Sequence, residues 1–227
     1  MLVDLAKRFV VVVGGGGVAE RKAKGALECG AEVRVVAPEA TDGLAALAAK
    51  KKIEWLRREF HPADVEKAFV VFAATDNAAV NTRVCQACDV AGVLVNRAEA
   101  PEASDFIVPA VLRRGRFCVA ISTGGASPHL GQIIRDRLEK EFGPEYIDYI
   151  ALLEKARLEA MRTIPDPKAR RQALRTLAED DSLVRILRHG GPEAALQHAR
   201  HSIATAAHAK SGTTEYTEHT EEEHSRS

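Results

Sequence analysis

The chain has 227 residues, of which 46% are hydrophobic and 28% are charged, and its 32 Lys and Arg are balanced by 32 Asp and Glu. This length is sufficient to bury the core of one large domain or two modest ones. The charge balance argues against a nucleic-acid binder with a globally basic surface, and no apolar stretch approaches the ~18 residues of a transmembrane helix. The N-terminus lacks the order of a signal peptide and four cysteines are too few for a disulfide scaffold, so we expect a cytoplasmic protein without a membrane partner.

Short β-branched runs alternate with helical patterns over the first hundred residues. Phe9–Val13 is a continuous apolar run that ends in four glycines, as expected of a strand buried on both faces. Further strands are predicted at 32–36, 53–56, 70–74 and 93–95, and helices at 18–29, 44–50 and 78–91. This alternation predicts an α/β domain with a parallel sheet covered by helices.

The pattern changes after Pro101. Runs at 106–112 and 117–122 predict a β-hairpin. Helices are then predicted at 128–142, 146–164, 167–177, 182–189 and 193–209. The last 17 residues hold five Glu and no aliphatic residue, which predicts a disordered tail. We therefore expect an α/β domain at 1–104, a hairpin region at 105–145, a helical domain at 146–210 and a tail at 211–227.

A glycine-rich loop follows the first predicted strand. Gly14, Gly16 and Ala19 occupy the three small-residue positions of the dinucleotide fingerprint G-x-G-x-x-A. Because the loop lies between a buried strand and a helix, its backbone can turn tightly and approach a pyrophosphate on the helix N-terminus. The alternative is a glycine-rich turn without a ligand. We predict a Rossmann-type parallel sheet that binds a dinucleotide.

The choice of dinucleotide depends on the end of the second strand. Glu39 lies about 20 residues past the fingerprint and can reach a ribose hydroxyl. No arginine follows it immediately to hold a 2′-phosphate, so we favour NAD over NADP. At the end of the fourth strand, Thr75 and Asp76 either cap the next helix or contact the cofactor.

Six motifs in fixed order resemble those of the precorrin-2 dehydrogenases, the NAD-dependent enzymes of sirohaem synthesis. The motifs are Gly-Gly-Gly-x-Val-Ala-x-Arg-Lys at 14–22, Val-Val-Ala-Pro at 35–38, Ala-Ala-Thr-Asp at 73–76, Val-Asn at 95–96 before Ala-Pro at 100–101, Asp-Phe-Ile at 105–107 with Pro109, and Ile-Ser-Thr-Gly-Gly-Ala-Ser-Pro at 121–128. The resemblance spans roughly residues 2–146. Some members of this family are also sirohydrochlorin ferrochelatases.

The resemblance implies that precorrin-2 loses two hydrogens, with NAD+ as hydride acceptor, to give sirohydrochlorin. The dinucleotide-binding positions that it implies are Gly17, Val18, Pro38, Glu39 and Asn96. The tetrapyrrole-binding positions that it implies are Thr123, Gly124 and Ser127. It also implies a homodimer, in which the hairpin region is a dimerisation region.

One position departs from the family pattern. The family usually reads Val-Asn-Val-x-Asp-x-Pro after the fifth strand, and its Asp is assigned to proton or metal handling. Glu99 stands at that position here, so we interpret it as a general base, the alternative being a solvated loop residue. Arg97 beside it would keep Glu99 ionised or attract a substrate carboxylate. The change weakens the case for a ferrochelatase more than for a dehydrogenase, because hydride transfer needs mainly positioning.

Precorrin-2 carries eight carboxylates, so a basic cleft is expected. Arg113, Arg114 and Arg116 in the predicted hairpin turn supply part of it or are simply solvated. Cys85 and Cys88 have no second pair at zinc-site spacing, so we predict helix packing and no metal site. A non-catalytic dinucleotide sensor with the same glycine loop is the alternative from a different functional class.

Overall fold

A computed structural model of the protein describes residues 3–100 and 103–208. The predicted tail at 211–227 lies outside the described residues. The chain divides into two compact units, residues 1–108 and residues 109–227. Within the described ranges, no helix is long and apolar enough to cross a membrane.

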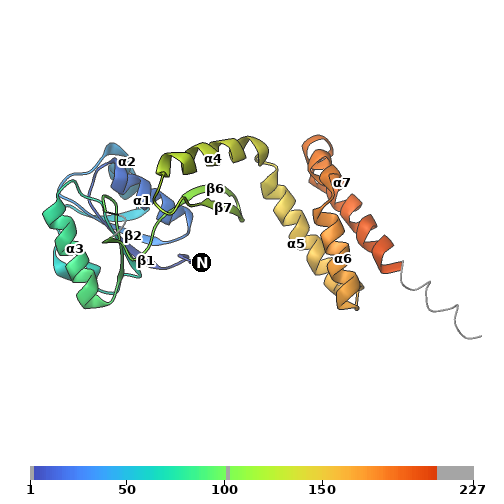
Figure 1. The fold of residues 1–227 in the computed structure, drawn as a ribbon, viewed down its shortest axis with the longest axis horizontal. Coiled ribbons are helices and arrows are strands. Elements are labelled where there is room, and N and C mark those ends of the chain that lie inside the picture. The colour runs from blue at the N-terminus through green and yellow to red at the C-terminus, as the bar shows by residue number, and fades with distance from the viewer. Residues whose placement is uncertain (1–2, 101–102, 209–227) are drawn as a thin grey trace, which may run out of the picture. The chain divides into compact units, whose positions relative to one another are not determined.

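The first unit is built on a parallel sheet of five strands (Figure 1). The strands are β1 (Phe9–Val13), β2 (Glu32–Val36), β3 (Ile53–Leu56), β4 (Val70–Ala73) and β5 (Leu94–Arg97). Their spatial order is β3-β2-β1-β4-β5, and every adjacent pair is parallel. The chain therefore leaves β1 in opposite directions toward β2 and β4, which creates the crevice where parallel α/β sheets bind ligands. The predicted Rossmann-type fold is confirmed.

Helices cover both faces of this sheet. They are α1 (Gly17–Glu28), α2 (Asp42–Ala49) and α3 (Ala78–Ala91). Val10 and Val12 of β1 pack into a core with α1, whereas Val11 and Val13 pack into a second core with α3. Burial on both faces explains why β1 is continuously apolar.

A short 3-10 helix, η1 (Pro62–Val65), was not predicted from the sequence. His61 accepts a hydrogen bond from the Ala63 backbone N–H, and Asp64 accepts one from the His61 backbone N–H. These reciprocal caps, rather than hydrophobic periodicity, hold the turn.

The second unit begins with an antiparallel hairpin of β6 (Ala110–Arg114) and β7 (Phe117–Ile121), followed by α4 (Pro128–Glu141). The strand predicted at 106–112 was wrong at its start, since β6 begins at Ala110. Pro109 has no backbone N–H to give to a ladder, and the Phe106 carbonyl accepts a hydrogen bond from the Asn96 side chain instead.

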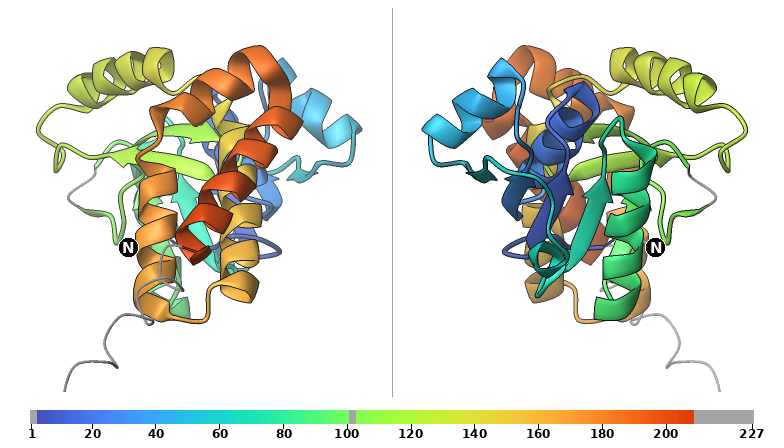
Figure 2. Two further views of the ribbon diagram at one scale, coloured as in Figure 1. Left: turned by 90° about the vertical axis from the view of Figure 1, so that its right-hand side faces the viewer. Right: turned by 90° about the vertical axis from the view of Figure 1, so that its left-hand side faces the viewer.

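Three helices complete the second unit: α5 (Tyr146–Thr163), α6 (Pro167–Ala178) and α7 (Asp181–His208). Figure 2 shows them side by side, and their shared core includes Leu152, Leu177 and Leu183. The two helices predicted at 182–189 and 193–209 meet at a kink inside α7, where Gly191 leaves the helical conformation (φ 79°, ψ 176°) just before Pro192.

Candidate functional site

A cleft of about 1070 Å³ opens in the first unit at the carboxyl ends of the central strands. Its walls come from the glycine loop, the segment after β2, the β4–α3 loop with the start of α3, and the residues after β5. The predicted positions that line it are Gly14, Gly16, Gly17, Val18, Pro38, Glu39, Thr75, Asp76 and Glu99. The structure thus brings the predicted cofactor loop and the predicted carboxylate into one cavity.

The glycine loop is pressed against two neighbouring segments. A Cβ on Gly14, which has φ +126°, would lie 2.3 Å from the Ala74 carbonyl oxygen, and a Cβ on Gly15 would lie 1.8 Å from that of Glu39. Gly16 and Gly17 differ, because a Cβ on either would meet no atom within 4 Å. Gly16 precedes α1 and offers no side-chain cap, so the first N–H groups of this helix are left for a ligand.

The segment after β2 is held beside this loop. The Thr41 backbone N–H donates to the Gly15 carbonyl (2.9 Å), and Trp55 Nε1 donates to the Ala37 carbonyl (2.9 Å). These bonds fix the backbone on both sides of Glu39, whose side chain is exposed at the cleft. An acidic residue at this place is suited to accept hydrogen bonds from ribose hydroxyls.

In the β4–α3 loop, the residue that caps α3 differs from the two candidates that the sequence suggested. Asn77, rather than Thr75 or Asp76, caps α3, since its Oδ1 accepts hydrogen bonds from the N–H groups of Ala79 (3.0 Å) and Val80 (3.2 Å). Thr75 and Asp76 line the cleft.

Asn81 on the first turns of α3 is a residue that sequence reasoning missed. Its side chain is 1% exposed and makes three hydrogen bonds to Thr75. The available signal was an amide at a core-facing position of a helix, where apolar residues are the rule.

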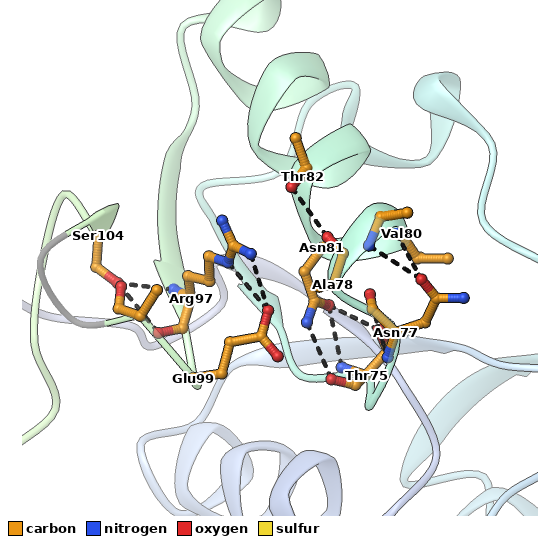
Figure 3. Close-up of polar contacts among 11 residues, drawn as sticks. Thr75, Asn77, Ala78, Val80, Asn81, Thr82, Arg97, Glu99 and Ser104 are labelled. Atoms are coloured by element: carbon orange, nitrogen blue, oxygen red, sulfur yellow. Dashed lines mark hydrogen bonds and ion pairs between the residues drawn. The ribbon is translucent and has the colours of Figure 1, made fainter.

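Glu99 faces the cleft from the segment after β5. Arg97 donates from Nε and Nη2 to its Oε1, at 3.1 and 2.9 Å (Figure 3). Side-chain hydrogen bonding from Asn81, followed by that from Arg97, lowers the pKa of Glu99 from its ordinary value. The carboxylate is therefore ionised at neutral pH, which is the first of the two effects proposed for Arg97 from the sequence.

Two predicted cofactor positions do not line the cleft. Ala19 is fully buried in the core between α1 and the sheet, where only a small side chain allows close packing. Asn96 is 5% exposed, and its Nδ2 donates to the Phe106 carbonyl (2.8 Å) while its Oδ1 has no hydrogen-bond partner among the described residues.

The predicted tetrapyrrole positions belong to the second unit. Thr123, Gly124 and Ser127 form the turn before α4, in which Thr123 Oγ1 accepts from the Ser127 N–H (3.1 Å) and Ser127 Oγ caps the helix. Arg114 donates to the Phe142 carbonyl and Arg116 pairs with Glu154. These contacts lie within that unit, as does Arg113, which is paired in the hairpin with Cys118.

Arg83 is the only basic residue among the described residues that line the cleft, and the sequence reading did not select it. Its acidic neighbours in the lining are Glu39, Glu59, Asp76 and Glu99. Cys88, by contrast, is buried, and burial raises the pKa of its thiol to about 12, in line with the predicted packing role.

Fold and cleft together define a Rossmann-type dinucleotide-binding protein. Residues 1–110 match a family model described as NAD(P)-binding, and residues 114–141 match one described as sirohaem biosynthesis protein, central. A solved structure titled "SirC, precorrin-2 dehydrogenase" is 30% identical, with a TM-score of 0.69 over 88% of this chain and 98% of that chain. The chain belongs to the precorrin-2 dehydrogenase family, as its motifs predicted.

Most of this chain also matches part of two longer proteins. Siroheme synthase 1 of Aeromonas salmonicida is 38% identical over 209 residues, which cover 91% of this chain and 44% of the relative. A siroheme synthase of Pseudomonas aeruginosa is 33% identical over 209 residues, which cover 92% of this chain and 45% of that relative. The chain spans less than half the length of these relatives.

Proposed function

We propose that this protein oxidises precorrin-2 to sirohydrochlorin with NAD+ as hydride acceptor. The observation that carries the proposal is one cleft lined by both an uncapped glycine-rich helix start and the Glu99 carboxylate. Membership of the precorrin-2 dehydrogenase family supports the choice of reaction and substrate. A non-catalytic sensor would need the glycine loop but no carboxylate in the same cavity.

The residues of the cleft fit a dinucleotide. A pyrophosphate suits the space beside Gly16 and Gly17, where a Cβ would meet no other segment of the chain within 4 Å, and the N-terminal N–H groups of α1 favour its charge. Glu39 would accept hydrogen bonds from a ribose and would repel a 2′-phosphate, which supports NAD over NADP. When bound, the nicotinamide accepts the hydride.

Loss of two hydrogens from precorrin-2 as a hydride and a proton requires a proton acceptor. Glu99 is ionised at neutral pH, faces the cleft and is held by Arg97, so we assign it this role. We also assign to Arg83 the binding of a substrate carboxylate, because a guanidinium can pair with a carboxylate through two parallel hydrogen bonds.

The direct test is anaerobic incubation of the purified protein with precorrin-2 and NAD+, followed by absorbance of NADH and of sirohydrochlorin. We expect both products in equal amounts, and much slower turnover with NADP+. Failure to form either product would overturn the proposed function. Addition of Fe2+ to sirohydrochlorin in the same preparation, followed by spectroscopy, tests the alternative of an additional ferrochelatase activity.

We further propose a cytoplasmic homodimer that assembles through the hairpin region, as the family resemblance implies. Cys85, Cys88 and Cys118 form no disulfide, which suits a reducing compartment. Sedimentation equilibrium tests the assembly, and a monomer at micromolar concentration would contradict it.

A further inference from the structure

We propose that Asn81 is a positioning residue that fixes the Thr75 segment of the cofactor cleft and the Glu99 carboxylate relative to each other. The inference rests on the proposed function, because it gives Asn81 its effect through the proposed base. Asn81 itself does not line the cleft, whereas Thr75, to which it is hydrogen-bonded, and Glu99 do.

The hydrogen bonds to Thr75 fix the orientation of the Asn81 amide. Its Oδ1 accepts from the Thr75 backbone N–H (3.2 Å) and from Thr75 Oγ1 (2.8 Å), and its Nδ2 donates to the Thr75 carbonyl (2.9 Å). A flipped amide would place Nδ2 against the Thr75 N–H and Oδ1 against the carbonyl, and both contacts would be repulsive. The orientation is therefore determined by Thr75.

One amide hydrogen of Asn81 remains after these bonds. Both acceptor sites of Oδ1 and one hydrogen of Nδ2 are engaged by Thr75, so the second hydrogen is left for another acceptor. Figure 3 shows the Glu99 carboxylate between the Arg97 guanidinium on one side and the Asn81 amide on the other. The free amide hydrogen of Asn81 is thus available to the neighbouring Glu99 carboxylate, and the influence of this amide lowers the pKa of Glu99.

The position of Asn81 is rigid. It is 1% exposed, and its backbone N–H donates to the Asn77 carbonyl (3.0 Å) at the start of α3. A buried amide in a helix costs free energy unless it is fully hydrogen-bonded, whereas an apolar residue would pack there without that requirement. The link between the β4–α3 loop and the segment after β5 gives this polar side chain a role that an apolar one lacks.

The charged groups around Glu99 determine how a substitution of Asn81 affects this carboxylate. Arg97 pairs with it from its own segment, and the other charged side chains of the cleft lining are Glu39, Glu59, Asp76 and Arg83. Asn81→Asp keeps the size and the acceptor sites for the Thr75 N–H and Oγ1. It removes both amide donors, so the bond to the Thr75 carbonyl is lost as well, and it adds negative charge beside Glu99. A displacement of a catalytic group by about 1 Å can cost about 100-fold in rate.

The test compares Asn81→Asp with wild type in the precorrin-2 assay. We expect kcat to fall by about 10- to 100-fold, with a smaller change in KM for NAD+ and an upward shift of the acidic limb of the pH profile. In a Glu99→Gln background the same substitution should have little further effect on kcat, because both changes act through one group. Thr82→Ala is the matched control, since Thr82 is exposed on the same helix and bonds only to the Ala78 carbonyl, and it should leave turnover unchanged.

Wild-type kinetics for Asn81→Asp, or effects that multiply fully with those of Glu99→Gln, would overturn the inference. If Asn81→Asp does not fold, Asn81→Ser, which is too short to reach Glu99, should give the same loss of kcat and the same non-additivity.

A measurement that does not require enzymatic turnover distinguishes this inference from the proposed function. The 13C NMR signal of the Glu99 carboxyl, assigned by its absence in Glu99→Gln, reports the pKa directly. We expect a higher pKa in Asn81→Ser, which removes the amide donor without adding charge, than in wild type, and an equal pKa would refute the positioning contact. Failure of wild type to oxidise precorrin-2 would refute the proposed function alone.

Discussion

Arg97 directs two of its nitrogen atoms at one oxygen of Glu99, with Nε and Nη2 lying 3.1 and 2.9 Å from Oε1. The second carboxylate oxygen, Oε2, takes no part in this pair. Arg97 is itself held, because its backbone N–H donates to Ser104 Oγ (2.8 Å). The arrangement orients the carboxylate and leaves one oxygen to receive a proton.

Replacement of Glu99 should separate catalysis from cofactor binding. We expect Glu99→Gln to lower kcat by about 100-fold, because the amide is isosteric but cannot accept the proton, while the Kd for NADH stays within experimental error. Glu99→Asp should retain more activity than Glu99→Gln. Stopped-flow turnover and fluorescence titration with NADH measure the two quantities, and equal kcat in all three proteins would exclude Glu99 as the base.

The pH dependence of turnover should reflect the lowered pKa of Glu99. Since hydrogen bonds from Asn81 and Arg97 bring this pKa below its ordinary value of 4.5, the base form persists to lower pH than in a free Glu side chain. We expect kcat to be flat between about pH 6 and 8 and to fall only below the ordinary pKa. Arg97→Gln should move this limb upward, and a limb near neutrality in wild type would contradict the assignment.

The glycine loop offers a matched pair of substitutions. Gly15→Ala should lower the melting temperature, because its Cβ would overlap the Glu39 carbonyl oxygen at 1.8 Å. Gly16→Ala should leave the melting temperature unchanged, since its Cβ meets nothing within 4 Å, yet weaken NADH binding by about tenfold, or 1.4 kcal/mol. Calorimetry and NADH titration on both variants measure these effects. If folded Gly16→Ala binds NADH as tightly as wild type, the pyrophosphate does not bind beside Gly16.

The sheet and the dinucleotide loop were predictable because strong local patterns encode them. The all-apolar β1 and the four glycines after it place the loop at the sheet edge without further information. The capping role of Asn77 and the link through Asn81 were not predictable, since they depend on how the β4–α3 loop folds against the segment after β5. Asn96 does not line the cleft, because its side chain donates to the Phe106 carbonyl ten residues later.

The ion pair between Arg58 and Asp64 of η1 should make stability depend on pH. Asp64 is 4% exposed and accepts hydrogen bonds from Arg58 and from the His61 N–H. Burial raises the pKa of the Asp64 carboxyl. The hydrogen bonds together outweigh burial, so this pKa lies below its ordinary value of 3.8. A lowered folded-state pKa contributes stability that is present above the unfolded pKa and is lost as pH falls through the folded one. Asp64→Asn should therefore melt several degrees below wild type at pH 7, with the difference shrinking below about pH 4.

Thermal melts between pH 3 and pH 7 check this window. Asp89→Asn is the control, because Asp89 is exposed on α3 and should melt like wild type throughout. A difference between Asp64→Asn and wild type that is independent of pH would show that packing, rather than the ion pair, holds η1.

Arg83 should be required for substrate binding more than for the chemical step. It is the only basic side chain among the described residues of the cleft lining, and two polyanionic ligands are proposed to enter that cleft. Loss of a charge-assisted hydrogen bond predicts that Arg83→Ala raises KM for precorrin-2 by about tenfold, with kcat changed far less and with Arg83→Lys intermediate. Arg21→Ala, at an exposed α1 position outside the lining, should leave KM unchanged. Steady-state kinetics at two salt concentrations measure the effect: the wild-type KM should rise with salt more steeply than that of Arg83→Ala, and parallel salt dependences would place the substrate carboxylates elsewhere.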